Sequence, residues 1–222
     1  TGMTTMPVTT FTPKDEPNWL EDTGLRGSMT DIYGLIQGVQ KGSYSINGAV
    51  FLSWIGHHLL NIMGAVDTTG PVSSIYTHIF SLLNSGTGQP PSHTLVDWQG
   101  LTATTNARTY AGASHSELVL KGNPESTLIE WSAKGSCFWS AAFPTSPPTS
   151  SPDTTSPIAA WRVELGFGGT VAGAKNLTVR DWEITLSREI AVQHTSQNSQ
   201  APFIIQRGKV GGAFKFYVAK PS

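Results

Sequence analysis

The 222-residue sequence is poor in charged side chains and has no excess of either sign. Asp, Glu, Lys and Arg together make up 13% of the residues, and the formal net charge is -1. A protein that holds nucleic acid through phosphate contacts needs a basic surface, so the composition argues against that class. Cys137 is the single cysteine, which excludes a disulfide framework within the chain. No apolar run approaches the length of a membrane-spanning helix, so we expect no membrane association.

The sequence is instead rich in residues that form turns and strands. It holds 23 glycines and 14 prolines together with many Ser and Thr, which is typical of short strands joined by turns. One helix is predicted over about residues 48–64, with Asn47 as its N-cap and Gly64 as a left-handed C-cap. Its large apolar residues recur at steps of three and four: Phe51, Trp54, Ile55, Leu59, Ile62 and Met63. We therefore predict a mostly β protein, one domain over 1–222, with this helix packed on a sheet.

The N-terminal segments lack a core of their own. Residues 1–22 are predicted to form an extended arm, because Pro7, Pro13 and Pro17 exclude a helix, and the composition favours an arm that is frayed. Residues 31–46 alternate imperfectly and carry three glycines, which predicts a long hairpin over about 25–46. A hairpin with so little apolar surface of its own is expected to project and to be buried by a partner.

The remaining strands are predicted from β-branched and aromatic runs bounded by turn residues. They lie at 74–80, 92–98, 105–110, 116–121, 126–143, 158–167 and 177–190, with a last pair in 203–218 that turns at Gly211 and Gly212. We expect a bend at 111–113, a break near Gly135, and a bulge near Arg180 and Asp181, where the apolar positions change phase. Residues 67–73 are predicted as a loop, and the Pro/Ser/Thr-rich stretch 144–157 as a solvated surface loop.

Histidines are the first candidates for site chemistry. His57 and His58 are adjacent on the predicted helix, so their side chains diverge by about 100° and do not suit one metal ion. His78 and His93 with Asp97 could form a zinc or iron triad, but no H-x-x-x-H or H-x-D signature supports it. Hydrogen-bonded histidines are therefore the favoured interpretation. We predict no catalytic residues, no metal ligands and no cofactor, with Cys137 as a buried small hydrophobe and residues 166–169 as a turn.

The seven tryptophans leave two interpretations open. Spread along the chain, they are expected to anchor the core and interfaces. Gathered on one face, they would form a platform for sugar rings, so a carbohydrate-binding β-sandwich, such as a lectin or a host-recognition module of a virion, is the alternative function. A hydrolase on a β scaffold ranks last, because no nucleophile motif is present. The tryptophans are Trp19, Trp54, Trp98, Trp131, Trp139, Trp161 and Trp182.

Five motifs, in their order and spacing, resemble the tail tube proteins, also called major tail proteins, of long-tailed bacteriophages. They are DIYG at 31–34, LLNIMG at 59–64, YTHIF at 76–80, QPPSHTL at 89–95 and NLTVR at 176–180. The resemblance covers nearly the whole chain. It implies a β-sandwich or barrel with one flanking helix. Six subunits would form a ring whose sheets join around a channel, and rings would stack into a tube through which the genome leaves.

The resemblance also implies partners. The chain would bind copies of itself and the tape-measure, tail terminator and distal tail proteins, in a virion tail assembled in the cytoplasm of the bacterial host. Double-stranded DNA would pass through the channel without specific binding. The arm and the hairpin would bind neighbouring copies through Phe11, Trp19, Leu20, Ile32, Tyr33, Leu35, Ile36 and Tyr44.

A channel that conducts DNA should be lined by carboxylates and hydroxyls, because unpaired cations hold DNA through counterion release. The acidic candidates for this lining are Glu117, Glu130, Glu164, Asp181 and Glu183. For any one of them, an ordinary solvated strand face is the alternative. Lysines should be distant or paired, so Lys121, Lys134 and Lys175 crowding the same wall would count against an acidic lining.

Overall fold

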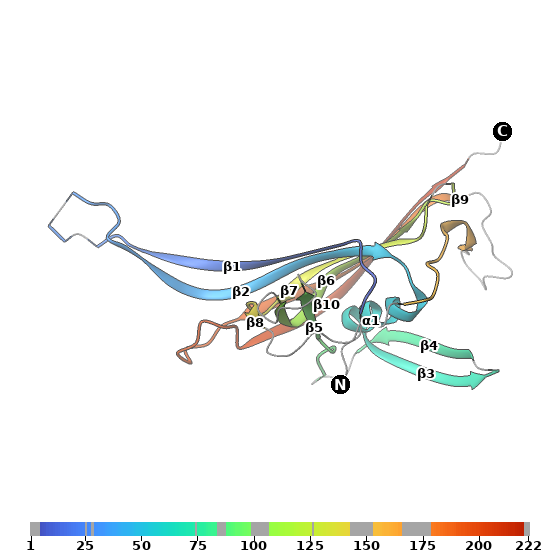
Figure 1. Ribbon diagram of the computed structural model, residues 1–222, viewed down its shortest axis with the longest axis horizontal. Coiled ribbons are helices and arrows are strands. Elements are labelled where there is room, and N and C mark those ends of the chain that lie inside the picture. Colours follow the sequence, from blue (N-terminus) through green and yellow to red (C-terminus); the bar gives the residue numbers. More distant parts are fainter. Residues whose placement is uncertain are drawn as a thin grey trace.

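The computed structural model of the protein describes residues 5–24, 26–27, 29–73, 75–83, 88–98, 107–125, 127–142, 153–165 and 179–219 (Figure 1). Strands make up 62% of the structure, which has one α-helix and antiparallel sheets. The predicted mostly β fold is therefore confirmed.

Most described strands belong to one eight-stranded antiparallel sheet with the main order β1-β2-β7-β6-β9-β10. These strands are β1 (Thr10–Asp22), β2 (Gly34–Ala49), β7 (Glu130–Cys137), β6 (Ala107–Gly122), β9 (Val179–Gln193) and β10 (Ile204–Val218). Two more strands, β5 (His93–Trp98) and β8 (Ala141–Ala142), pair with the first part of β6. Helix α1 (Leu52–Met63) leads into a separate two-stranded sheet, β3 (Gly64–Val72) and β4 (Ile75–Leu82).

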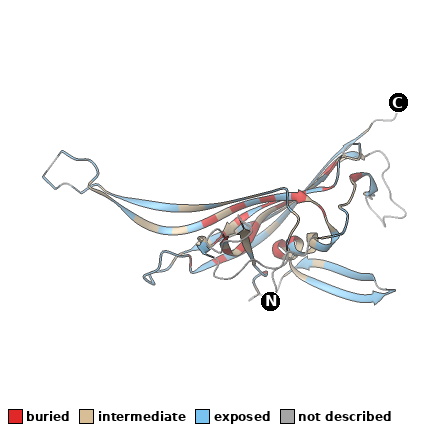
Figure 2. Ribbon diagram, viewed as in Figure 1, coloured by how far each residue is buried: buried red, intermediate tan, exposed pale blue. Residues whose placement is uncertain are grey.

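The sheet has one buried face because its strands alternate between apolar and polar residues. In β7, Trp131 and Ala133 are buried, whereas Ser132 and Lys134, which follow them in turn, are exposed. Residues that pair directly across antiparallel strands share a face, so the same alternation continues through the neighbouring strands. Helix α1 covers the buried face, and the buried residues gather between the helix and the middle of the sheet (Figure 2).

Helix α1 ends as predicted but begins differently. Gly64 adopts the left-handed conformation at φ 101°, and its N–H donates to the Leu60 carbonyl, so the C-cap is confirmed. The predicted N-cap is wrong, because Asn47 lies inside β2. Phe51 precedes the helix and provides no side-chain hydrogen bond to it.

The N-terminal arm and the predicted hairpin are the two strands of one longer hairpin. β1 pairs with β2 from Thr10 opposite Asn47 to Asp22 opposite Gly34, so residues 34–49 form a single strand and not a hairpin of their own. The prolines fit because β1 is an edge strand of the described sheet, where Pro13 and Pro17 need no N–H for a further neighbour. This hairpin extends away from the rest of the molecule at the left of Figure 1.

Further differences concern where strands turn. The predicted loop at 67–73 largely belongs to β3, and the predicted strand at 158–167 contains the 3-10 turn η2 (Ala160–Arg162). β10 runs straight through Gly211 and Gly212 because β9 pairs with it along that length. β6 is also continuous through 111–113, where Gly112 takes φ 66° and the register with β5 shifts. The bulge near Arg180 is confirmed, since Tyr217 faces Asp181 while Val218 faces Val179.

The predicted break near Gly135 corresponds to a bulge in the neighbouring strand. β7 is continuous there, and the register of β6 shifts between His115 and Glu117, which face Gly135 and Lys134. Of the surface loop predicted at 144–157, residues 144–152 lie outside the described residues. The same holds for the 166–169 turn and for Lys175.

Candidate assembly interface

The two outer strands of the described main sheet are β1 and β10. The outer edge of such a strand presents backbone N–H and C=O groups that another chain can pair with. Ladders along this path are all antiparallel, so strand direction alternates from β1 through β2, β7, β6 and β9 to β10. With six strands on the path, β1 and β10 run in opposite directions. In strand direction, the β1 edge of one copy therefore matches the β10 edge of the next as a further antiparallel pair, although Pro13 and Pro17 supply no N–H to it.

The face of the sheet opposite the helix carries lysines and carboxylates in cross-strand pairs. One row crosses four strands, with Glu130 of β7, Lys121 of β6, Glu183 of β9 and Lys215 of β10 facing one another in turn. Four ion pairs lie on this face: Lys41–Glu16 at 3.3 Å, Lys121–Glu130 at 3.0 Å, Lys134–Glu117 at 2.8 Å and Lys215–Glu183 at 2.8 Å. We call this surface the polar face.

Hydroxyl groups fill the polar face between the charges. Ser45 faces Lys134, and Ser132 faces Val119. The Ser43 hydroxyl donates to the Glu16 carboxylate at 2.6 Å, which is the main reason that the pKa of Glu16 is lowered. The pKa of Glu183 is lowered mainly by the hydrogen bond from Lys215. The carboxylates of Glu16 and Glu183 therefore stay ionised and paired at neutral pH.

Most of the acidic candidates fall on this one face. Glu117, Glu130 and Glu183 lie on it, each in an ion pair with a lysine of the same face. Asp181 lies on it because it is two residues before Glu183 in β9. Glu164 does not join them, since it follows η2 outside the strands. Lys121 and Lys134 lie on the face too, each paired with a carboxylate, so the surface combines both charges instead of being acidic.

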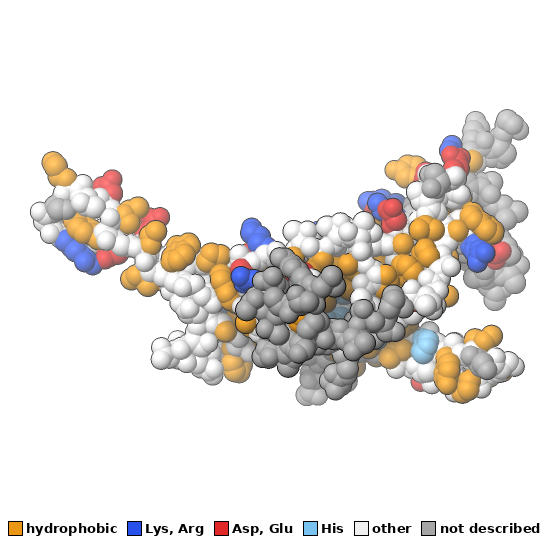
Figure 3. Space-filling model, viewed as in Figure 1, with side chains coloured by type: hydrophobic (Ala, Val, Ile, Leu, Met, Phe, Trp, Pro, Cys, Tyr) orange, Lys and Arg blue, Asp and Glu red, His pale blue; other side chains and the backbone are white. Residues whose placement is uncertain are grey.

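Apolar side chains are exposed at both ends of the molecule (Figure 3). At one end, the β1–β2 hairpin exposes Trp19, Leu20, Leu35 and Ile36. At the other end, the exposed residues belong to β3, β4 and the last part of β10: Val66, Val72, Ile75, Tyr76, Ile79, Leu82, Phe214, Phe216, Tyr217 and Val218. Exposed apolar surface of this extent marks a site of association.

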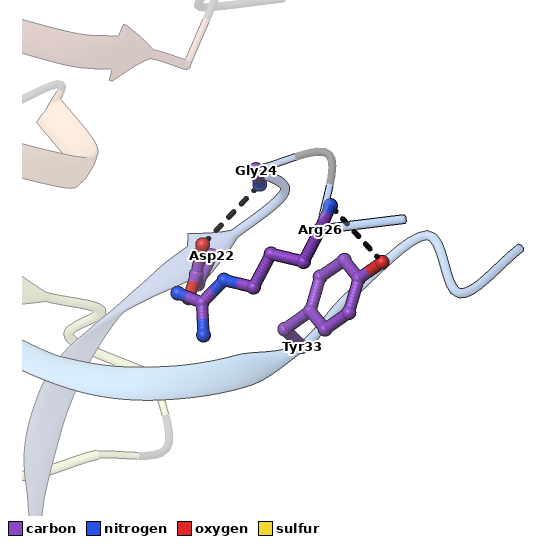
Figure 4. Close-up of polar contacts among 4 residues, drawn as sticks. All are labelled: Asp22, Gly24, Arg26 and Tyr33. Carbon is purple, nitrogen blue, oxygen red and sulfur yellow. Dashed lines mark hydrogen bonds and ion pairs between the residues drawn. The ribbon is translucent and has the colours of Figure 1, made fainter. Parts of the chain in front are cut away.

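The connection between β1 and β2 is held by a small polar cluster (Figure 4). Arg26 forms an ion pair with Asp22 and lies over the ring of Tyr33, 5.2 Å from its centroid. The Arg26 N–H donates to the Tyr33 hydroxyl at 3.3 Å, and the Tyr33 N–H donates to the Asp22 carbonyl at 2.8 Å. Gly24 donates to the Asp22 carboxylate at 3.2 Å. Tyr33 thus has contacts within its own chain that close the hairpin.

The other predicted contact residues divide into two groups. Five are exposed in the isolated subunit and remain candidates: Trp19, Leu20, Ile32, Leu35 and Ile36. Phe11 and Tyr44 belong to the core instead. The Phe11 ring meets Tyr110 edge-on at 6.0 Å, and Tyr44 is 3% exposed. The register explains this, because Phe11 and Tyr44 fall on the face that helix α1 covers.

A buried hydrogen-bonded chain joins the helix to the sheet. Tyr44 Oη lies 2.8 Å from His115 Nδ1, and His115 Nε2 lies 3.0 Å from His58 Nδ1. Asn61 accepts from the His115 backbone N–H at 2.8 Å and lies 3.2 Å from His93 Nδ1. Burial is the main cause of a low pKa in all three histidines. It lowers the pKa of His58 to about 3, the pKa of His93 to about 4, and the pKa of His115 well below its usual value. These histidines are neutral and structural at pH 7.

The buried hydrogen-bonded residues differ in part from those predicted among the histidines. The favoured interpretation is that His78 and His93 are hydrogen-bonded, and His93 lies 3.2 Å from the Asn61 amide nitrogen. His78 lies elsewhere, exposed on β4, with Nδ1 2.9 Å from the Thr68 hydroxyl. His115 was not singled out from the sequence, since its role depends on the register between β2, β7 and β6. Within the described ranges, no group of His, Cys, Asp and Glu is arranged to hold a metal ion.

The tryptophans do not form one platform. Trp131 and Trp182 are buried, while Trp19 on β1 and Trp161 in η2 are more than half exposed and belong to different parts of the fold. The Cys137 thiol is buried, as predicted, and burial raises its pKa to about 12. The part of the chain that the structure describes contains no helix long and apolar enough to cross a membrane.

Open sheet edges and exposed apolar ends are features of a structural subunit suited to association. The chain matches the sequence model of a family described as phage tail tube protein over residues 1–220, and it belongs to that family. It is therefore a structural component of the virion tail, from a family that self-assembles into a tube with other tail proteins. A comparison with curated protein sequences gives no match.

Proposed function

We propose that the protein assembles into rings of six copies, the number that the family resemblance implies, and that the rings stack into a tail tube. The direction of the outer strands supports lateral joining, since β1 and β10 of successive copies meet as an antiparallel pair. Joining each β10 edge to the next β1 edge leaves neither outer edge of the main strand path free in a closed ring. Stacking along the axis has no such closure, so the tube needs a separate factor to fix its length.

The polar face lines the channel in this proposal. It is the one large face of the sheet that neither helix α1 nor an apolar cluster occupies. Four of its lysines are each paired with a carboxylate: Lys41, Lys121, Lys134 and Lys215. Contact with these pairs releases few counterions from DNA, so DNA gains little affinity from them. Duplex DNA can then move past hydroxyls and neutral ion pairs without being held, as a conduit for genome ejection requires.

The partners of the protein and its site of assembly follow from the resemblance to the family. Tape-measure, tail terminator and distal tail proteins would set the length of the tube and close its ends, and assembly would take place in the cytoplasm of the bacterial host. The protein acts without a cofactor and is not an enzyme. The observation that carries the proposal is the combination of complementary sheet edges with a charge-paired face.

The test is assembly of the purified full chain. Electron microscopy across a concentration series should show rings or tubes with an open centre above a threshold concentration. The channel can be blocked in tubes assembled from Ser45→Cys copies that carry a bulky maleimide probe. DNA should no longer enter these tubes, because Ser45 lies beside Lys134 on the polar face. A probe on Leu52→Cys, at the exposed start of the helix, is the matched control. A chain that stays monomeric at every concentration contradicts the proposal.

A further inference from the structure

Helix α1 and the two strands after it form one structural unit beside the main sheet (Figure 1). Gly64 caps the helix and begins β3, and the Leu83 N–H donates to the Met63 carbonyl at 3.0 Å. β4 packs on the helix, since a Cβ at Gly56 would lie 3.1 Å from the Phe80 ring. Among the described strands, β3 and β4 pair only with each other. The helix is therefore the main link between this unit and the main sheet.

That link is largely polar. Three residues of the helix are buried, and two of them, His58 and Asn61, are polar. His58 contacts His115 of β6. Asn61 accepts from the His115 backbone, donates to the Ala113 carbonyl at 2.9 Å and lies beside His93 of β5. Three histidines from three elements therefore meet at the point where α1 is attached to the sheet.

This attachment point cannot accommodate an additional proton. His58 Nδ1 lies against His115 Nε2, and His58 Nε2 is buried without a hydrogen-bond partner within the described ranges. A second proton on His58 therefore opposes a donor of His115 or leaves a buried, charged N–H without an acceptor. Arg207 also opposes a charge on His93 and His115, in addition to the effect of their burial. The titratable and charged groups packed around the three histidines include no carboxylate; they are His57 in α1, Tyr44 in β2, Cys137 in β7, Arg188 in β9 and Arg207 in β10.

We propose that His58, His93 and His115 form a pH-sensitive latch, in which acid frees α1 together with β3 and β4 while the main sheet stays paired. Separation of the helix exposes the three rings to water, where each takes up a proton near pH 6.5. The half-buried side chains of the helix, Ile55, Leu59 and Met63, favour the closed form at neutral pH. The ladders from β1 to β10 contain no residue of the freed unit. The latch acts within one subunit, so it does not depend on assembly into tubes.

Hydrogen exchange of the purified full chain at pH 7 and pH 5 tests the latch, with rates corrected for the intrinsic effect of pH. A histidine whose pKa rises from about 4 to about 6.5 on opening shifts the equilibrium about 20-fold between these pH values. A helix of this length is marginal in water once it leaves the sheet. Amides of α1 should therefore lose protection by about 20-fold or more, while those of β2, β6 and β7 keep theirs. Equal loss in all strands, or no loss in α1, would overturn the latch.

Replacing one ring tests whether the histidines are responsible. His93→Asn removes a titrating group, so the loss of α1 protection at pH 5 should be smaller by about 20-fold than in the wild type. His78→Asn, at an exposed position of β4 in the same unit, is the matched control and should respond as the wild type does. Melting temperatures at pH 7 confirm that each variant folds, and the wild-type exchange pattern decides the question if one does not. An unchanged acid response in folded His93→Asn would overturn the latch.

Spin labels test whether β3 and β4 leave with the helix. Thr77→Cys on β4 and Ser132→Cys on β7 are both exposed, and Cys137 is buried and does not compete for the label. The distance between the two labels should be narrowly distributed at pH 7 and broad at pH 5. A distribution that stays narrow at pH 5 would show that the unit remains attached, which contradicts the inference.

Discussion

Tyr44 and His115 meet across Gly135, which lies between them in the sheet. Tyr44 pairs with Gly135 in β2–β7, and His115 pairs with Gly135 in β7–β6, so the three residues form one row on the core face. Since Gly135 has no side chain, the Tyr44 hydroxyl passes over it and lies 2.8 Å from His115 Nδ1. This contact connects the projecting hairpin, through His115 and His58, to helix α1.

Substituting Gly135 should disrupt this contact. A Cβ atom there would lie 1.9 Å from the Ser114 carbonyl oxygen and 2.7 Å from the Tyr44 hydroxyl. Neither backbone nor a buried ring can move freely, so we expect Gly135→Ala to lower the free energy of unfolding by about 3 kcal/mol. Urea denaturation measures the change. Gly34→Ala is the control, because a Cβ at Gly34 meets nothing within 4 Å; equal stability of the two variants would contradict the geometry.

Removing the Tyr44 hydroxyl tests the hydrogen bond itself. Burial raises the pKa of Tyr44, so the phenol stays protonated and shares a hydrogen bond with His115 Nδ1. Tyr44→Phe leaves that buried nitrogen without a partner and should cost about 1–3 kcal/mol of stability. Tyr76→Phe, at an exposed position of β4, should change stability little. A Tyr44→Phe protein as stable as the wild type in thermal denaturation would show that the contact contributes nothing.

Acid should destabilise the subunit before its carboxylates titrate. Burial holds the pKa of His58 at about 3 and of His93 at about 4, whereas an unfolded histidine has a pKa near 6.5. The unfolded chain therefore binds more protons, so stability is complete above pH 6.5 and falls as the pH drops toward 4. The slope approaches at most about 1.4 kcal/mol per pH unit for each histidine.

Urea denaturation between pH 7 and pH 5 measures this slope, because most unfolded carboxylates remain ionised in that range. His93→Asn should give a shallower slope than the wild type, since one buried histidine is removed. Stability that does not change from pH 7 to pH 5 would contradict a neutral buried cluster.

The ion pairs on the polar face predict how strongly assembled tubes bind DNA. Replacing Glu117, Glu130 and Glu183 together by Gln frees Lys134, Lys121 and Lys215 on that face. Binding of short duplex DNA to open tubes should strengthen and become more dependent on salt. Stability should change by less than about 1 kcal/mol per pair, because the lysine of each pair is more than half exposed.

The control carries the same change in net charge away from that face. Glu125→Gln, Asp67→Asn and Asp153→Asn alter three carboxylates outside the main sheet. DNA binding that rises equally in both triple variants would mean that net charge, and not the lining of the channel, is responsible.

Local signals in the sequence identified local features. Gly64 follows the last apolar residue of the helix, and the phase change at Arg180 marks a bulge, so both were predictable. Pairing between segments that are far apart in the sequence was not predictable. The prolines of β1 indicate a frayed arm until the strand opposite is known, and Gly211 and Gly212 indicate a turn until β9 pairs with them.

The residues of the candidate assembly interface were also only partly predictable from the sequence. The exposure of Trp19, Leu20, Leu35 and Ile36 was predictable because they lie in segments without a core, and they remain candidates for contacts. Tyr44 was not separable from them, since its burial depends on Gly135 and His115, which are far away in sequence. The lysine partners of Glu117 and Glu130 likewise follow from the register of β6 and β7 and not from spacing along the chain.

The most direct test of this account is a cryo-electron microscopy reconstruction of tubes assembled from the purified full chain. The account predicts rings of six copies around an open channel, with β1 beside the neighbour's β10 and with Lys134, Glu117 and Ser45 on the channel wall. A tube in which this face points outward, or in which the β1 and β10 edges of neighbouring copies do not meet, would contradict it.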